Sequence, residues 1–249
     1  MTGPAFLPPA GLALLIFDLD GTLIDSRADL AQSVNAMLRH LGRTPLPEAV
    51  VAEYVGDGAP LLVRRALGLL PAPDRTRPSQ PPPGLEGAAQ RLAEEGLEYF
   101  LAYYTEHMLD RTTLYPGVAA GLAALAGAGF ALAVLSNKPE RPSREIVGHL
   151  GVARYFLAVH GGNSFEQKKP DPVGIRALLA ASGLAPRAAA MIGDSAVDVR
   201  AGRNAGTWTC GVTYGFMPAT LALEPPDWTA ASFAELSLQL LAARTAVAG

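Results

Sequence analysis

Two aspartates directly after one short apolar run constrain this chain more than any other feature. Residues 12–17 are apolar throughout, and Asp18-Leu19-Asp20-Gly21 follows them. A continuous apolar stretch this short, closed by a glycine turn, is typical of a buried strand in a parallel sheet. Ligands of α/β folds bind at the carboxyl ends of such strands. Because two neighbouring carboxylates repel each other, we expect a hard divalent cation such as Mg²⁺ between them, since it prefers oxygen ligands.

The rest of the chain divides into two kinds of pattern. After residue 112, apolar strands are expected at 130–135, 157–160, 188–192 and 207–212, with helices between them. This alternation predicts an α/β fold with a Rossmann-like parallel sheet. Helical spacing interrupts the alternation at 29–42, 48–55, 59–70 and 85–109. We therefore expect residues 1–27 and 112–249 to form an α/β core, and residues 28–111 to form an inserted helical domain.

A proline-rich stretch lies inside the helical block. Residues 71–84 read PAPDRTRPSQPPPG. This composition predicts an extended, exposed loop or linker.

Charge and cysteine content exclude several classes of protein. The chain has 20 basic and 23 acidic residues, which gives no electrostatic reason to expect a nucleic-acid or anionic-membrane partner. No apolar run approaches the roughly 20 residues of a membrane span, and the first nine residues make a poor signal peptide. The single cysteine, Cys210, excludes an intrachain disulfide and fits a small buried hydrophobe. We expect a cytoplasmic protein; nothing indicates its oligomeric state.

Polar residues follow several of the predicted strands, and the carboxyl ends of parallel strands meet at one edge. These groups are Asp18 and Asp20, Ser136-Asn137-Lys138, and Gly193-Asp194 with Asp198; Lys168-Lys169-Pro170 opens a helix between the last two. Carboxylates can bind a metal ion there, while lysine, hydroxyl and amide groups bind phosphate oxygens. The set therefore predicts a metal-bridged phosphate site.

Each of these residues alone has a purely structural alternative. Ser136 or Asp194 could cap the helix that follows it. Lys169 could be a solvated surface lysine, as Lys168 is expected to be, and Asp198 an exposed helix residue. Their combination favours a functional site.

In this order the groups resemble the four motifs of the haloacid dehalogenase superfamily of phosphohydrolases. The matching segments are Asp18-Leu19-Asp20-Gly21-Thr22, Ser136, Lys169 before Pro170, and the G-D-x-x-x-D pattern from Gly193 to Asp198. The resemblance implies a Mg²⁺-dependent phosphomonoester hydrolase with a helical cap, formed here by residues 28–111, which closes over the site and selects a small phosphate ester. Dehalogenation is disfavoured, because relatives that attack carbon lack the second acid, here Asp20.

The resemblance implies that Asp18 is the nucleophile and forms an aspartyl-phosphate. Asp20 is then the general acid and afterwards the base. The expected metal ligands are Asp18, the backbone carbonyl of Asp20, and Asp194. Asp198 is expected to orient Lys169 or a metal-bound water.

The resemblance also implies a set of substrate contacts. Ser136 and Lys169 are expected to hold the transferring phosphoryl group. Asn137 and Thr22 are expected to contribute further substrate contacts.

Five stretches narrow the resemblance to phosphoglycolate phosphatases: Asp25-Ser26, Val34-Asn35, and residues 55–67, 115–118 and 136–141. This similarity implies 2-phosphoglycolate as the substrate. A cap arginine would meet its carboxylate, and Arg64 is the candidate, with Arg65 beside it.

Three alternatives remain open from the sequence. A sugar-phosphate phosphatase or a phosphosugar mutase would share the motifs. A non-catalytic regulatory protein could keep the scaffold, although neither Asp18 nor Asp20 is lost. A phosphorylated receiver module would share the acidic cluster but would need no helical insert.

Overall fold

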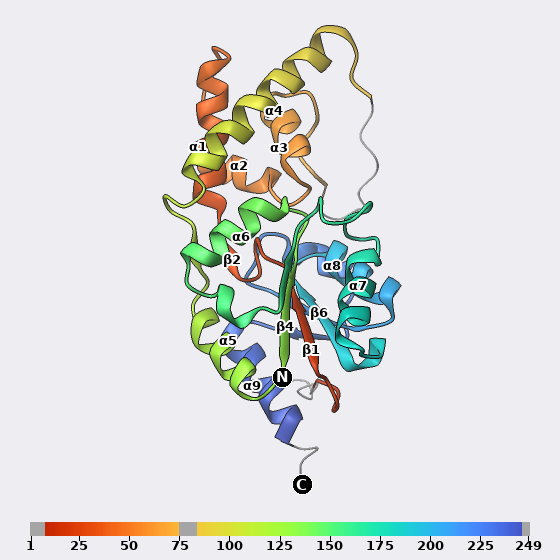
Figure 1. Cartoon of the computed structure of the whole chain (residues 1–249). Helices are drawn as coiled ribbons and strands as arrows, with labels where there is room; N and C mark the ends of the chain where they lie inside the picture. The colour runs from red at the N-terminus through yellow and green to blue at the C-terminus, as the bar shows by residue number, and fades with distance from the viewer. Residues whose placement is uncertain (1–7, 75–83, 246–249) are drawn as a thin grey trace, which may run out of the picture. The chain divides into compact units, whose positions relative to one another are not determined.

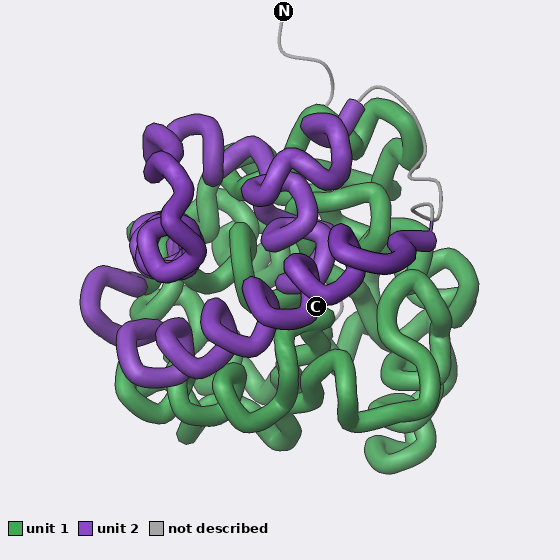
Figure 2. The backbone as a smooth tube through the Cα atoms, turned by 90° about the horizontal axis from the view of Figure 1, so that it is seen from above, with its two compact units in different colours: residues 1–24, 114–249 green, residues 25–113 purple. Residues whose placement is uncertain are grey.

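The structure is a computed structural model that describes residues 8–74 and 84–245. Its chain forms two compact units (Figure 2): unit 1 is Met1–Ile24 with Leu114–Gly249, and unit 2 is Asp25–Thr113. The domain boundaries expected from the sequence lie a few residues from these. Most of the proline-rich stretch, residues 75–83, lies outside the described residues.

Unit 1 is built on a six-stranded parallel sheet with the order β5-β4-β1-β6-β7-β8 (Figure 1). The strands are β1 (Leu14–Phe17), β4 (Ala131–Leu135), β5 (Ala158–His160), β6 (Ala189–Gly193), β7 (Trp208–Val212) and β8 (Trp228–Ala230). The expected α/β fold with a parallel sheet is confirmed. The edge strand β8 is the one member of this sheet that the sequence pattern did not predict.

Helices cover both faces of this sheet. They are α5 (Val118–Gly127), α6 (Glu140–His149), α7 (Val173–Ser182), α8 (Ala196–Ala205) and α9 (Phe233–Thr245). Alternate residues of a strand point to opposite faces. Leu14 and Ile16 accordingly belong to one hydrophobic cluster with Ile175 of α7. Phe17 packs on the other face, with its ring centroid 5.8 Å from that of Phe233 in α9.

The described residues of unit 2 form four helices: α1 (Arg27–His40), α2 (Glu48–Tyr54), α3 (Ala59–Ala66) and α4 (Gly87–His107). Two short strands, β2 (Ile24–Asp25) and β3 (Thr113–Leu114), pair where the chain enters and leaves this unit. Asp29 is fully buried near the start of α1, and its Oδ2 accepts hydrogen bonds from the Thr112 N–H at 2.8 Å and hydroxyl at 2.7 Å. This carboxylate therefore fastens the outgoing segment to the incoming helix. None of the helices in the described part of the chain has the length and apolar character needed to span a bilayer.

Candidate active site

The strand order brings the polar strand ends together. β1 lies between β4 and β6, so that Phe17 is paired with Val134 on one side and with Ile192 on the other. The Asp18 N–H continues this ladder by donating to the Ile192 carbonyl at 2.8 Å. The residues that follow β1, β4 and β6 therefore emerge side by side at the carboxyl edge of the sheet.

Lys169 is the central cation of this edge. Its Nζ donates to Asp18 Oδ1 at 2.7 Å and to Asp198 Oδ1 at 2.7 Å. The lysine side chain is 3% exposed, so this is not a solvated surface lysine. Because a buried ammonium is costly without counter-charges, the two carboxylates stabilise Lys169 in this position, and Lys169 in turn orients Asp18.

Three carboxylates form a tight acidic cluster. Asp18, Asp194 and Asp198 each offer an oxygen within 4.8 Å of the others, and all three are buried. Asp194 is held by the backbone, since its Oδ2 accepts N–H bonds from Phe216 at 2.5 Å and Met217 at 2.9 Å. The geometry is that of a preformed set of oxygen ligands.

The turn glycines of this edge make room for the acidic cluster. Gly21 has φ +85°, and a Cβ added there would lie 2.4 Å from Asp194 Oδ2. A Cβ at Gly193 would lie 2.2 Å from Cγ of Asp198. Only a residue without a side chain allows the carboxylates to approach the backbone this closely.

The cluster carries more negative charge than its surroundings neutralise. Burial raises the pKa of Asp194 to about 8, and the charges of Asp198 and Asp18 add to the rise. Burial also raises the pKa of Asp18 to about 6, against the opposing effect of Lys169. Burial alone would lower the pKa of Lys169, but Asp18 and Asp198 raise it above its usual value.

A divalent cation fits this donor set. The edge holds four carboxylates, those of Asp18, Asp20, Asp194 and Asp198, against two ammonium groups. When all four carboxylates are ionised, they exceed the two ammonium groups by two negative charges, which is the charge that one divalent ion neutralises. Clustered carboxylate oxygens are the ligands that Mg²⁺ prefers, so the residues present suit a divalent metal.

Asp20 lies beside the cluster and has its own cation. Both of its carboxylate oxygens accept hydrogen bonds from Lys138 Nζ, each at 3.0 Å. Lys138 was grouped from the sequence with the polar strand ends but was given no role in the site. Its position in the polar segment after the β4 strand was a signal that could have found it.

The three expected substrate-binding residues of unit 1 each have different contacts in the structure. Ser136 is 3% exposed, and its Oγ accepts a hydrogen bond from the Lys138 N–H at 3.3 Å. Asn137 uses Nδ2 to donate to the Lys169 carbonyl at 3.0 Å, which ties the loop of Lys169 to the end of β4. Thr22 is fully buried; its hydroxyl has no hydrogen-bond partner among the described residues, and its carbonyl accepts from the Tyr214 hydroxyl.

The structural alternatives for two site residues can be compared with the helix ends. Helix α6 begins with Pro139 as its N-cap, so Ser136 does not cap it. Helix α8 has Ser195 as its N-cap. Asp198 does have a local structural contact, because its Oδ2 accepts hydrogen bonds from the Ser195 N–H at 3.2 Å and hydroxyl at 2.6 Å. One carboxylate thus caps its helix and also pairs with Lys169.

Cys210 takes no part in this site. It is buried in β7, and burial raises the pKa of its thiol well above its usual value. This agrees with its expected role as a small buried hydrophobe.

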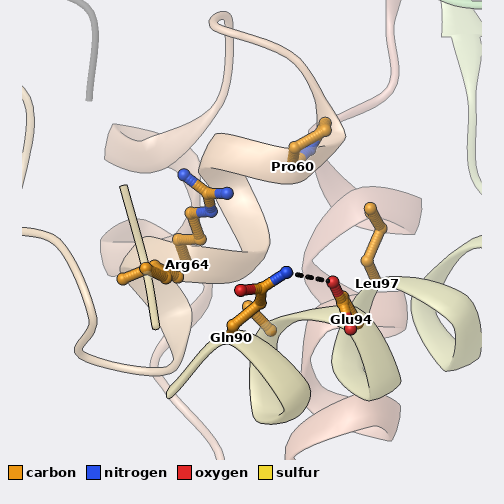
Figure 3. A pocket seen from close by; sticks show the side chains of 7 residues that line it. Pro60, Arg64, Gln90, Glu94 and Leu97 are labelled. Carbon is orange, nitrogen blue, oxygen red and sulfur yellow. Dashed lines mark hydrogen bonds between the residues drawn. The ribbon is translucent and has the colours of Figure 1, made fainter. Parts of the chain in front are cut away.

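The two arginines of unit 2 have distinct surroundings. Arg64 lines a pocket between α3 and α4 together with Gln90, which donates a hydrogen bond to Glu94 at 2.9 Å (Figure 3). Arg65 forms an ion pair with Asp57 at 2.7 Å, and both side chains are 10% exposed. Arg65 is therefore engaged within unit 2, and Arg64 is the less constrained of the two.

Comparisons with known proteins agree with this geometry. A family model described as haloacid dehalogenase-like hydrolase matches residues 12–206. A protein from Neisseria meningitidis named phosphoglycolate phosphatase is 40% identical over 224 residues, which are 88% of this chain and 90% of that protein. One of the same name from Chromobacterium violaceum is 38% identical, covering 88% of this chain and 92% of its own.

Solved structures give the same result. The crystal structure of a predicted phosphoglycolate phosphatase from Haemophilus somnus superposes with a TM-score of 0.78 at 32% identity, and covers 91% of this chain and 96% of its own. A putative phosphoglycolate phosphatase from Lactobacillus delbrueckii has a TM-score of 0.81 at 26% identity, covering 93% of this chain and 98% of its own.

Proposed function

Because the chain belongs to the haloacid dehalogenase-like hydrolase family, we propose that it is a Mg²⁺-dependent phosphatase that hydrolyses small phosphate monoesters, with 2-phosphoglycolate preferred. The resemblance inferred from the four motifs is confirmed, and the chain is an enzyme of the hydrolase class. The observation that carries the proposal is the buried Asp18 carboxylate, fixed 2.7 Å from Lys169 within an acidic cluster. The names of the relatives support the choice of substrate.

The first half of the proposed reaction transfers the phosphoryl group to Asp18. One carboxylate oxygen of Asp18 attacks phosphorus, and the bond from phosphorus to the ester oxygen breaks. Asp20 gives a proton to the leaving oxygen. A phosphate monoester carries close to two negative charges at pH 7, so Lys169 reduces the repulsion between the two anions, and the Ser136 hydroxyl donates to a phosphate oxygen.

The second half releases phosphate. Asp20 takes a proton from a water molecule, the water oxygen attacks phosphorus, and the bond to Asp18 breaks. The carboxylate of Asp18 is thereby restored beside Lys169. Asn137 acts indirectly, because its hydrogen bond to the Lys169 carbonyl keeps the loop that carries Lys169 in place.

The proposed reaction also requires a metal ion at the acidic cluster. Asp18, Asp194 and the backbone carbonyl of Asp20 would hold it, with Asp198 adjacent. When bound, Mg²⁺ would neutralise charge on the phosphoryl oxygens and on Asp18. The unmatched negative charge of the cluster supports this assignment.

Unit 2 is the proposed cap, which would exclude water during transfer and select the substrate. Arg64 remains the proposed cap contact for the substrate carboxylate. A phosphosugar mutase on the same scaffold would pass the phosphoryl group back to its substrate, so analysis of the products separates it from a phosphatase.

The test is phosphate release from a panel of monoesters, with Mg²⁺ and with EDTA. The wild-type protein should prefer 2-phosphoglycolate over sugar phosphates in kcat/KM and should lose activity in EDTA. A control for the loss of an aspartate outside the site is Asp227→Asn. Asp227 accepts hydrogen bonds from Thr209 at the start of β7, away from the carboxyl edge of the sheet. Full activity in EDTA would contradict the metal assignment, and equal turnover of all esters would contradict the substrate.

A further inference from the structure

Lysine is rare in this chain and is concentrated at the site. Of the 20 basic residues only three are lysines, Lys138, Lys168 and Lys169, and the others are arginines. At the carboxyl edge of the sheet Lys169 is buried and the Lys138 side chain is largely buried, whereas Lys168 is exposed. An ammonium is a compact charge on a flexible stem and can change partner more easily than the planar fork of arginine.

Lys138 is built into the site rather than solvated. Its side chain is 7% exposed, and that of its partner Asp20 is 20% exposed. Its backbone is fixed on both sides, since its N–H donates to Ser136 Oγ at 3.3 Å and its carbonyl accepts from the Gly162 N–H at 2.8 Å. The ammonium is therefore positioned at the end of β4 and turned toward Asp20.

The pair of Lys138 and Asp20 conflicts with the proposed work of Asp20. To protonate the leaving oxygen, Asp20 must turn a carboxyl oxygen to the ester, but in this structure both of its oxygens accept from Lys138. If Asp20 turns away, the largely buried Lys138 ammonium loses this ion pair, and an anion on the substrate can take the place of Asp20.

The proposed substrate carries such an anion. In 2-phosphoglycolate a single methylene carbon joins the ester oxygen to the carboxylate. To act as the acid, Asp20 must lie within hydrogen-bond distance of the ester oxygen, about 3 Å. Lys138 Nζ lies 3.0 Å from Asp20 Oδ1 and is therefore also near the ester oxygen. The substrate carboxylate would thus arrive within reach of Lys138.

We propose that Lys138 selects phosphate esters with a carboxylate next to the ester oxygen, and that its ammonium passes from Asp20 to this carboxylate when the substrate binds. The exchange frees Asp20 to face the leaving oxygen. This inference rests on the proposed phosphatase function and assigns to the core a share of the recognition that the sequence assigned to the cap. No covalent bond changes in the exchange, because one ion pair replaces another.

The experiment compares two substrates on several variants in the presence of Mg²⁺. The substrates are 2-phosphoglycolate and its neutral carboxamide analogue, 2-phosphoglycolamide; the proteins are wild type, Lys138→Met, Lys138→Arg and the control Lys168→Met. The wild type should prefer the carboxylate in kcat/KM by about 10- to 100-fold, the range of a hydrogen bond between charged groups. Lys138→Met should bring this ratio close to one, mainly through a higher KM for the carboxylate. Lys138→Arg should keep part of the preference, and Lys168→Met all of it.

The outcomes separate the two proposals. If Lys138→Met lowers kcat/KM equally for both substrates, Lys138 acts only through Asp20 and the inference is wrong. If the wild type hydrolyses both esters equally well, the inference is wrong even if Lys138→Met does not fold, while the phosphatase function stands. If the wild type releases phosphate from no monoester, the proposed function fails and the inference fails with it.

Discussion

The carboxyl edge of unit 1 and the interior of unit 2 both contain buried charged side chains, but the two regions pair these charges differently. In unit 2, Arg65 pairs with Asp57, and Asp29 accepts backbone and hydroxyl hydrogen bonds from Thr112. At the edge of unit 1, one ammonium, that of Lys169, is shared between two carboxylates, and Asp194 has a pKa raised to about 8 by burial and by its acidic neighbours.

This difference separates charges that serve folding from charges that serve chemistry. A matched pair holds two elements together and needs nothing further. An excess of buried carboxylates destabilises the fold, so its presence indicates a ligand that supplies the missing positive charge. The predictions below test this distinction, in order of decreasing effect.

The largest effect is expected from Asp18→Asn. An amide cannot serve as the nucleophile, and removal of a nucleophile that acts as part of a unit lowers kcat by about 10⁴-fold or more. The fold should remain, because the substitution removes one charge from an overcharged cluster. Steady-state assays with thermal melts check both; activity near that of the wild type would remove Asp18 from the nucleophile role.

Lys169→Met is expected to lower both activity and stability. The substitution leaves Asp18 and Asp198 without their shared cation, and breaking a buried pair costs about 3–5 kcal/mol in the free energy of unfolding. Denaturant unfolding of the metal-free protein measures this change. A loss of activity with no change in stability would show that the edge does not depend on Lys169 for its charge balance.

The metal-free protein should lose stability as pH rises. The pKa of Asp194 is about 8 and that of Asp18 about 6 in the folded state, against 3.8 for an ordinary aspartate. The folded state therefore binds more protons than the unfolded state between about pH 4 and pH 8, so the free energy of unfolding falls as pH rises through this window.

Magnesium should oppose this loss. At a concentration of 100 times its Kd, a ligand adds about 2.7 kcal/mol, which corresponds to a rise in Tm of about 5–10 °C for a chain of this size. The rise should be larger at pH 8 than at pH 5, because protons compete with the metal for the carboxylates. Melts with Mg²⁺ and with EDTA at both pH values check this; a shift independent of pH would contradict it.

The smallest effect is expected from the matched pair of unit 2. Arg65→Met should lower the free energy of unfolding by about 2 kcal/mol, since Asp57, whose side chain is 10% exposed, loses its ion pair with Arg65. The value of kcat should change less than tenfold, in contrast to Lys169→Met. A loss of kcat as large as that of Lys169→Met would place Arg65 among the functional charges and break the comparison.

Much of the fold could be predicted because local patterns report it directly. The apolar run before Asp18 predicted the central strand β1, and the helical spacing over residues 85–109 predicted α4. The strand β8 has only three residues, Trp228–Ala230, and such a short segment carries no periodicity that a sequence pattern can show.

The sequence could predict which residues gather at the carboxyl edge, but not which of them form hydrogen bonds with one another. Parallel strands bring their carboxyl ends together, which is why Asp18, Ser136 and Asp194 could be grouped from the sequence. The contact between Lys138 and Asp20 joins residues 118 positions apart. It depends on the paths of the loops that follow β1 and β4, which the sequence pattern does not report. The backbone donors of Phe216 and Met217 leave no signal at all, because an N–H group belongs to every residue except proline.

The most direct measurement is a rapid acid quench of the wild-type protein mixed with Mg²⁺ and radiolabelled 2-phosphoglycolate. The account predicts a covalent phosphoryl label on the protein that hydroxylamine releases, as expected of an acyl phosphate, and that Asp18→Asn does not form. Phosphate release at full rate with no label on the wild-type protein, or a label of equal size on Asp18→Asn, would contradict the assignment of Asp18 as the nucleophile.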